Sequence, residues 1–183
     1  SWPSPPPRSY GLVPCRTSQG VVKKVVLAMA EGLAGINIGN LKVEGLFAMA
    51  PSITGTVAFQ GLIEASGGIP CKPGTPRPAY HALSLVAQKL GGFSQVEPVT
   101  LDRGVYAYRF TVEQQRVYVL WYDDGRRYLP GDPEPVARVR IPLPKGEYRL
   151  TETPTAPGPA PSRIVSVPQA GWSTELGCTP IFL

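Results

Sequence analysis

The sequence predicts an α+β fold, with helices and one short strand in the first half and antiparallel β-structure in the second half. Three observations support this prediction. Apolar residues recur at helical spacing near residues 17–33 and 78–90. From residue 104 onward, apolar and polar residues alternate with a period of two, and turn residues separate the segments. The composition, with 43% hydrophobic and 17% charged residues, is that of a globular protein.

The first helix is expected to begin at Thr17 or Ser18, because either hydroxyl can accept a hydrogen bond from a free amide of the first turn. The helix continues to about Leu33, and glycines follow it. The apolar side chains expected on one face are Val22, Val25, Val26, Met29 and Leu33.

The segment after this helix, GINIGNLKV (35–43), is predicted to form a short buried strand that contains Ile36 and Ile38. Residues 44–58 are rich in Gly, Ala, Ser and Thr and are predicted to be a long loop. FQGLIEAS (59–66) is predicted to be a short helix, and the Gly- and Pro-rich residues 67–77 are predicted to be a loop.

A second helix is predicted over residues 78–90. Pro78 suits its first turn, where an amide hydrogen would have no helical partner. Gly91 and Gly92 end it, because glycine adopts positive φ without strain. The apolar stripe expected along the helix consists of Leu83, Val86, Ala87 and Leu90.

Six strands are predicted in the second half. They cover residues 104–112, 116–124, 135–143, 146–153, 162–168 and 174–183. In the first of them Tyr106, Tyr108 and Phe110 form one apolar-aromatic face. Six strands with no helix between them favour an antiparallel sandwich. The sequence therefore divides into residues 1–95 and a β-sandwich over residues 96–183.

Charge and composition argue against several classes of function. Residues 1–95 carry the whole net charge of +5, and Lys23-Lys24 is the only basic doublet among them. A nucleic-acid interface would need clustered basic residues interleaved with aromatics, so no nucleic-acid partner is expected. No run of 18 apolar residues is present, so no membrane partner is expected.

The few cysteines and the single histidine restrict the chemistry. Cys15, Cys71 and Cys178 are too scattered for a zinc site. A Cys15–Cys71 disulfide remains open, because both residues lie in segments that resemble loops. His81 lies inside the second predicted helix and is interpreted as a structural or surface residue rather than a catalytic one. No metal and no cofactor are expected.

Four stretches of the chain are informative together. They are QGVVKKVVLAMAEGLAGI (19–36), FQGLIEASGGIPCKPGTPRPAYHALSLVAQKLGGF (59–93), VYVLWYDDG (117–125) and TPIFL (179–183). In this order they resemble the C-terminal end of a clan-A glycoside hydrolase, which is a (β/α)₈-barrel enzyme often followed by a small β-sandwich. The resemblance implies that residues 1–95 contain the last βα units of such a barrel, incomplete in this chain, and that residues 96–183 are the accessory sandwich.

In this family two glutamates hydrolyse the O-glycosidic bond, one as acid/base and one as nucleophile, with carboxyls about 5 Å apart in retaining members. The acid/base glutamate follows the fourth barrel strand, and the nucleophile lies at the end of the seventh. The resemblance implies that this chain starts just after the seventh strand, so neither catalytic glutamate is in it. Glu31 and Glu64 are interpreted as surface residues, and the chain alone is expected to be inactive.

The resemblance also implies which residues would line the mouth of the parent barrel. Trp2 lies in the loop after the seventh strand, and Asn40 and Lys42 lie at the end of the eighth, where the family usually has an aromatic residue. Glu44 follows that strand and could face the mouth, where the active sites of these barrels are found. These four residues are the candidate substrate-binding residues.

The predicted sandwich offers two weaker candidate sites. Trp121, Tyr122 and Trp172 could stack on sugar rings, although Trp121 is better interpreted as a core residue. Asp123-Asp124-Gly125 could suggest calcium, but the EF-hand spacing is absent and a hairpin turn explains the string better.

Two functions follow from the sequence. The chain is either the C-terminal portion of a glycoside hydrolase or a non-catalytic β-sandwich that binds carbohydrate or assembles with a partner. As a fragment it would expose strand edges and the apolar faces of its helices. The expected partners are therefore the carbohydrate substrate of the parent enzyme, and the remainder of the barrel or another copy of the chain.

Overall fold

The computed structural model describes residues 14–38, 62–66, 72–126, 128 and 132–183, and these residues have a mixed α+β fold with antiparallel sheets. Its described helices are α1 (Pro14–Ala30) and α4 (Pro78–Leu90). The described strands are β1 (Ile63–Ser66), β2 (Lys72–Pro76), β3 (Phe93–Pro98), β4 (Val105–Val112), β5 (Gln115–Tyr122), β6 (Ala137–Ile141), β7 (Gly146–Glu152), β8 (Ser162–Val167), β9 (Trp172–Leu176) and β10 (Ile181–Phe182). The predicted α+β class is confirmed.

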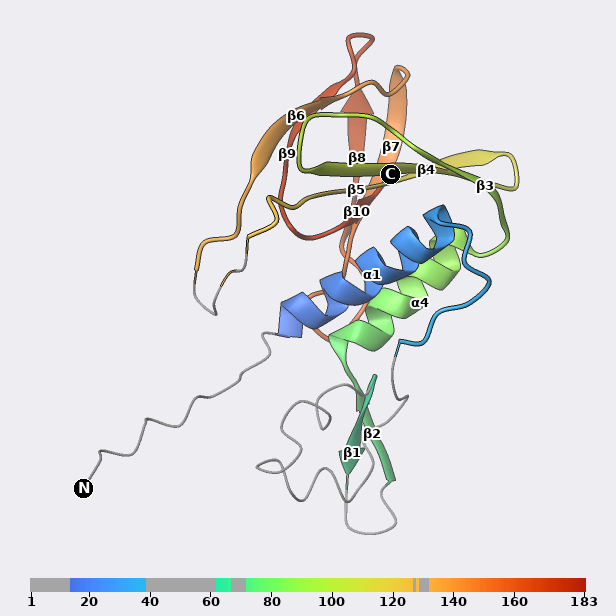
Figure 1. Cartoon of the computed structure of the whole chain (residues 1–183), viewed down its shortest axis with the longest axis vertical. Coiled ribbons are helices and arrows are strands. Elements are labelled where there is room, and N and C mark those ends of the chain that lie inside the picture. Colours follow the sequence, from blue (N-terminus) through green and yellow to red (C-terminus); the bar gives the residue numbers. More distant parts are fainter. Residues whose placement is uncertain (1–13, 39–61, 67–71, 127, 129–131) are drawn as a thin grey trace, which may run out of the picture.

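The largest sheet has six strands in the order β3-β4-β5-β10-β7-β8, and every neighbouring pair is antiparallel. The short strand β10 lies in the middle, where Ile181 pairs with Leu120 on one side and with Glu152 on the other. The C-terminal end of the chain therefore joins the two halves of the sheet. Strands β6 and β9 form a separate antiparallel pair (Figure 1).

Five of the six strands predicted in the second half are confirmed, as β4, β5, β6, β7 and β8. The sixth prediction, a single strand over 174–183, is wrong. That segment contains the end of β9, which pairs with β6, and all of β10, which belongs to the large sheet. Between them, the Gly177 carbonyl accepts a hydrogen bond from the Tyr122 amide, and the Pro180 carbonyl accepts one from the Thr153 amide. These bonds hold the chain where it crosses from one sheet to the other.

Strands β1, β2 and β3 were not predicted. Residues 59–66 were expected to be helical and 67–77 to be a loop, but Ile63–Ser66 pairs with Lys72–Pro76. The two backbones approach closely at Gly74, where a Cβ atom would lie 2.9 Å from the Glu64 carbonyl oxygen. Glycine permits this approach, and proline is tolerated in such a two-stranded ribbon because one edge of each strand has no partner.

The predicted strand at 35–43 is not present in its described part. Residues 35–38 have no regular structure, and Ile36 is exposed, whereas Ile38 is half-buried against the core. Residues 39–43 lie outside the described residues. The helix predicted to reach Leu33 instead ends at Ala30, where Gly32 has a φ of 69°, and Leu33 is 62% exposed.

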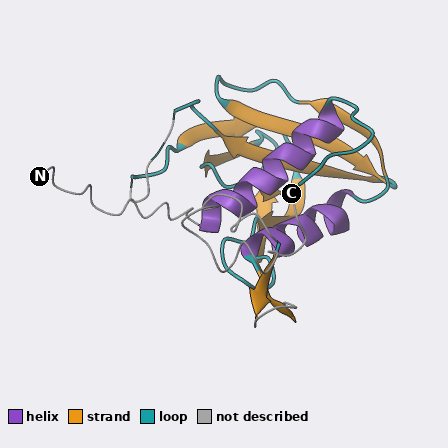
Figure 2. Ribbon diagram, turned by 60° about the horizontal axis from the view of Figure 1, so that its bottom comes forward, coloured by secondary structure: helices purple, strands orange, loops and turns teal. Residues whose placement is uncertain are grey.

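The helix predicted over 78–90 is confirmed at both ends. Its buried face is rotated from the predicted stripe, because Leu85 is buried and Ala87 is exposed, while Leu83 is half-buried. This face of α4 packs on the sheet, and α1 packs beside α4 on the same sheet. The shared core of helices and sheet consists of Val22, Val25, Val26, Ala82, Leu85, Val86, Leu90, Phe110, Val119, Trp121 and Phe182. Figure 2 shows both helices lying across one face of the sheet.

The two helices lie side by side and run in the same direction, from the lower left to the upper right in Figure 1. Two neighbouring helices can be parallel only if the chain between them returns to the starting end. Residues 31–77 make this return, and the β1–β2 ribbon then leads directly into α4, where the Arg77 amide donates to the Leu62 carbonyl.

The opposite face of the large sheet is covered by the β6–β9 pair. This second core contains Val139 and Ile141 from β6, Trp172 and Leu176 from β9, and side chains of β4, β5, β7 and β8. The large sheet is therefore the middle one of three layers. The division at residue 95, made from the sequence, falls inside β3, which pairs with β4. Neither described helix is long and apolar enough to cross a membrane.

Because Phe110 is 0% exposed and its ring packs edge-on against Phe93 beneath the helices, Phe110→Ala should lower the free energy of unfolding by about 3–5 kcal/mol. The matched control Ile164→Ala, at a side chain that is 57% exposed, should change it by less than about 0.5 kcal/mol. Urea denaturation measures both, and Phe110→Leu provides a milder variant if the alanine protein does not fold. Equal effects of the Phe110 and Ile164 variants would contradict the shared core.

Candidate functional site

The four candidate substrate-binding residues, Trp2, Asn40, Lys42 and Glu44, all lie outside the described residues. The described residues do include the acids that the sequence interpretation placed on the surface. Glu31, at the end of α1, and Glu64, on β1, are both exposed, in agreement with that interpretation. His81 is half-buried on α4, and its ring lies edge-on to Tyr80 at a centroid distance of 5.6 Å. A structural role for His81 is consistent with this geometry.

Asp123-Asp124-Gly125, the string considered for calcium, forms two successive Asx turns. The Asp123 carboxylate accepts a hydrogen bond from the Gly125 amide at 3.0 Å, and the Asp124 carboxylate accepts one from the Arg126 amide at 3.0 Å. The sequence suggested a β-hairpin turn, and this prediction is wrong. Strand β5 pairs with β4 and β10 and not with the next strand, β6. In the described part of the chain, no group of three or more potential metal-binding side chains occurs.

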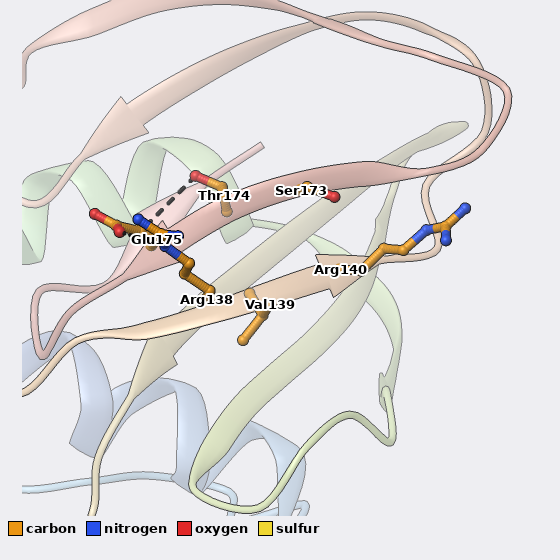
Figure 3. A pocket seen from close by; sticks show the side chains of 6 residues that line it. All are labelled: Arg138, Val139, Arg140, Ser173, Thr174 and Glu175. Atoms are coloured by element: carbon orange, nitrogen blue, oxygen red, sulfur yellow. Dashed lines mark hydrogen bonds and ion pairs between the residues drawn. The ribbon is translucent and has the colours of Figure 1, made fainter.

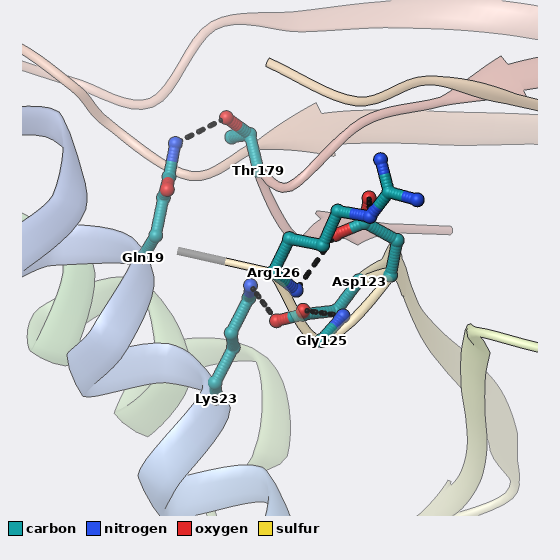
Figure 4. Close-up of polar contacts among 7 residues, drawn as sticks. Gln19, Lys23, Asp123, Gly125, Arg126 and Thr179 are labelled. Atoms are coloured by element: carbon teal, nitrogen blue, oxygen red, sulfur yellow. Dashed lines mark hydrogen bonds and ion pairs between the residues drawn. The ribbon is translucent and has the colours of Figure 1, made fainter. Parts of the chain in front are cut away.

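The Asp123 turn also holds helix α1 to the sheet. Lys23 donates to the Asp123 carboxylate at 3.1 Å, and Gln19, one turn earlier on α1, donates to the Thr179 hydroxyl at 2.7 Å (Figure 4). Both contacts join residues that are a hundred or more positions apart, so no local sequence pattern could have predicted them. Together they define the position of α1 along its axis, and its rotation about that axis, relative to the end of β5 and the segment before β10.

The neighbouring Asp124 carboxylate has a specific partner in Tyr128, whose hydroxyl donates to it at 2.6 Å. This hydrogen bond and the Arg126 amide lower the pKa of Asp124. The same bond raises the pKa of Tyr128 to about 12. The Arg126 guanidinium lies 3.8 Å from the Asp124 carboxylate and is itself largely exposed. The charged groups of Asp124 and Arg126 therefore interact with other groups of the same turn and stabilise its conformation.

A shallow groove of about 420 Å³ lies on the outer face of the β6–β9 pair (Figure 3). Its charged side chains are already engaged within the protein. Arg138 donates to the Glu175 carboxylate on the paired strand at 2.9 Å, and the Arg140 Nε donates to the Ala170 carbonyl at 2.7 Å. Val139, Ser173 and Thr174 complete the groove, and none of its described lining residues is aromatic. A groove whose charged groups are already paired, and whose described lining has no aromatic ring, suits a solvated strand surface better than a sugar platform.

The tryptophans considered for sugar stacking are core residues. Trp121 is 1% exposed, and its ring stacks on Tyr106 at a centroid distance of 5.1 Å, on the face beneath the helices. Trp172 is buried in the second core, and Tyr122 is half-buried. The interpretation of Trp121 as a core residue is confirmed, and Trp121 and Trp172 have no exposed ring face for a sugar.

Cys15 lies in α1 and not in a loop as expected. The Cys15–Cys71 disulfide itself is untested, because Cys71 and the side chain of Cys15 lie outside what the structure describes. Cys178 is free and half-buried, and this burial raises the pKa of its thiol. A nucleophilic role at neutral pH would require the opposite shift.

A second cluster of polar residues was missed by the sequence interpretation. His81 and Lys89 of α4 and Arg149 of β7 line one cleft, although they are far apart along the chain. The period-two pattern places Arg149 on the opposite face from Leu150, but it does not indicate which helix covers that face.

No family model, no curated protein and no solved structure matches this chain.

Tyr128→Phe should raise the pKa of Asp124 toward the ordinary value of an aspartate, because the hydroxyl that favours the charged carboxylate is removed. Since the folded-state pKa of Asp124 is lowered, its hydrogen bonds stabilise the fold above the unfolded-state pKa, and this contribution is lost as the pH falls through the lowered value. Carbon-13 NMR titration of the Asp124 carboxyl measures the shift.

The control is Tyr148→Phe, which also removes a tyrosine hydroxyl hydrogen bond, in that case to the Pro144 carbonyl on another part of the molecule. An Asp124 pKa that is the same in all three proteins would show that the Tyr128 contact does not form in solution.

Proposed function

We propose that this chain is the C-terminal portion of a glycoside hydrolase, in which the last βα units of a (β/α)₈ barrel carry an accessory β-sandwich. The parent enzyme would hydrolyse O-glycosidic bonds with two glutamates that lie outside this chain. The chain alone is then inactive. The proposal rests first on the resemblance of residues 19–36, 59–93, 117–125 and 179–183 to that family.

The parallel helix pair is the structural observation that supports the proposal most strongly. In a (β/α)₈ barrel all helices run in the same direction, and consecutive helices are joined through the strand between them. Helices α1 and α4 are neighbours, run in the same direction and are joined by residues 31–77. This is the direction and neighbourhood expected of two consecutive barrel helices.

The direction of the helices also suggests where the substrate would bind. In these barrels the helices begin on the face where the strands end, and the active site lies on that face. The β1–β2 ribbon immediately precedes α4, so it belongs to that face of the parent. Asn40, Lys42 and Glu44 occur in the same connection, and Trp2 precedes α1, which favours these four as substrate-binding residues.

The sandwich layers support a structural role more than a glycan-binding role. Their buried tryptophans, Trp121 and Trp172, fill the two cores. The remaining partner of the chain would be the rest of the barrel or another copy. Exposed Leu33 and Ile36 after α1 and exposed Tyr80 on α4 are apolar side chains that such a partner could cover.

The test compares the chain with a longer polypeptide that includes the preceding coding sequence, assayed on a panel of aryl glycosides and polysaccharides. The proposal predicts hydrolysis by the longer polypeptide and none by the chain. In the active polypeptide, Glu44→Gln should lower kcat/KM about ten-fold, as expected for loss of one charged contact to substrate. The matched control is Glu31→Gln, at an exposed position at the end of α1, which should leave kcat/KM unchanged.

A preceding reading frame that lacks βα repeats with two glutamates would contradict the proposal. Affinity electrophoresis of the chain in polysaccharide gels tests the other function inferred from the sequence. Retardation of the chain by a glycan, together with an inactive longer polypeptide, would favour a carbohydrate-binding module instead.

A further inference from the structure

A cleft of about 310 Å³ lies between α4 and the β7–β8 hairpin, on the same face of the sheet as the helices. Helix α4 forms one wall with His81, Ser84, Gln88 and Lys89, which recur at helical spacing. Arg149 projects from β7 on the other side. Residues 158–160, in the loop between β7 and β8, also line the cleft.

The cleft is lined by basic side chains without acidic partners. Lys89, Arg149 and His81 all line it, and none of its described lining residues is an Asp or a Glu. Among the described residues, no hydrogen bond or ion pair connects Lys89 or Arg149 to an acid. Burial, and then the nearby Arg149 charge, lower the pKa of Lys89. Two cations that face one cleft and repel each other would be stabilised by a bound anion.

The walls of the cleft are fixed before any ligand binds. Leu85 anchors α4 in the shared core, and Ala160 of the β7–β8 loop packs against the same core. Two further lining residues are bonded to each other, because the Ser162 hydroxyl donates to the Thr151 hydroxyl at 3.0 Å between paired positions of β7 and β8. A preformed site loses less conformational entropy on binding than one that must be ordered by the ligand.

We propose that this cleft binds a sulfate or phosphate ester of a sugar-sized polyol. The Arg149 guanidinium matches two oxygens of a tetrahedral oxyanion, and the Lys89 ammonium adds a point charge. The cavity holds the volume of about ten water molecules, which exceeds what a single oxyanion occupies. Ser84 and Gln88 lie beside the basic groups and provide hydrogen-bonding groups for hydroxyls of the carrier. The inference does not depend on the proposed glycosidase function.

The test titrates the full chain with glucose 6-phosphate, glucose 6-sulfate, glucose, inorganic phosphate and inorganic sulfate, followed by calorimetry and by amide chemical shifts. At least one ester should bind and shift amides of α4 and β7, and glucose should not bind. Arg149→Gln and Lys89→Gln should each weaken ester binding about ten-fold, because each removes a cation that bonds the charged oxyanion.

The matched control is Arg163→Gln. Arg163 is exposed on β8 of the same hairpin but is paired with Leu150, so it lies on the opposite face of the sheet and carries the same charge. It should change ester affinity less than two-fold. Circular dichroism spectra and melting curves of all variants check that they fold.

Three results would overturn the proposal. The first is that neither ester binds at millimolar concentration. The second is that Arg163→Gln weakens binding as much as Arg149→Gln, which would indicate attraction by net charge alone. The third is that inorganic phosphate or sulfate binds as tightly as its ester, which would reduce the cleft to a site for an adventitious ion only.

Discussion

The fold depends on the burial of strand β5 on both of its faces. Four consecutive residues, Tyr118, Val119, Leu120 and Trp121, are all buried, although neighbouring side chains of a strand point to opposite sides of the sheet. Such a strand is stable in water only if both faces of its sheet are covered. Helices α1 and α4 cover one face, and the β6–β9 pair covers the other. The three layers therefore follow from one strand that has no solvated side.

This constraint also explains which contacts hold the helices. The apolar stripes of α1 and α4 form the shared core with the sheet, and burial of a large side chain contributes about 1.5–3 kcal/mol. The Lys23–Asp123 ion pair is partly exposed and contributes about 1 kcal/mol or less, so its effect is mainly on position. Because the helices are fixed on the sheet, the beginning of α4 defines where the β1–β2 ribbon lies. The polar side of α4 forms the basic cleft with β7 and β8.

Local patterns predicted the elements that local forces determine. Helix α4 is bounded by Pro78 and Gly91, and five strands were visible from their alternation. The elements that depend on distant partners were missed: β1 and β2 need the close approach at Gly74, and β10 is a strand because β5 and β7 flank it. The basic cleft was missed for the same reason, since His81 and Arg149 meet only through packing. The inferred barrel-mouth residues lie outside the described part of the chain.

The central claim is that the parallel helices and the sheet are one cooperative unit. Hydrogen exchange of the backbone amides tests it directly, because it measures the free energy of opening at each position. The account predicts that Val26 of α1, Leu90 of α4 and Val119 of β5 exchange through the same, most costly opening. Rapid exchange throughout both helices, while β5 stays protected, would show that the helices fold separately from the sheet and would contradict the account.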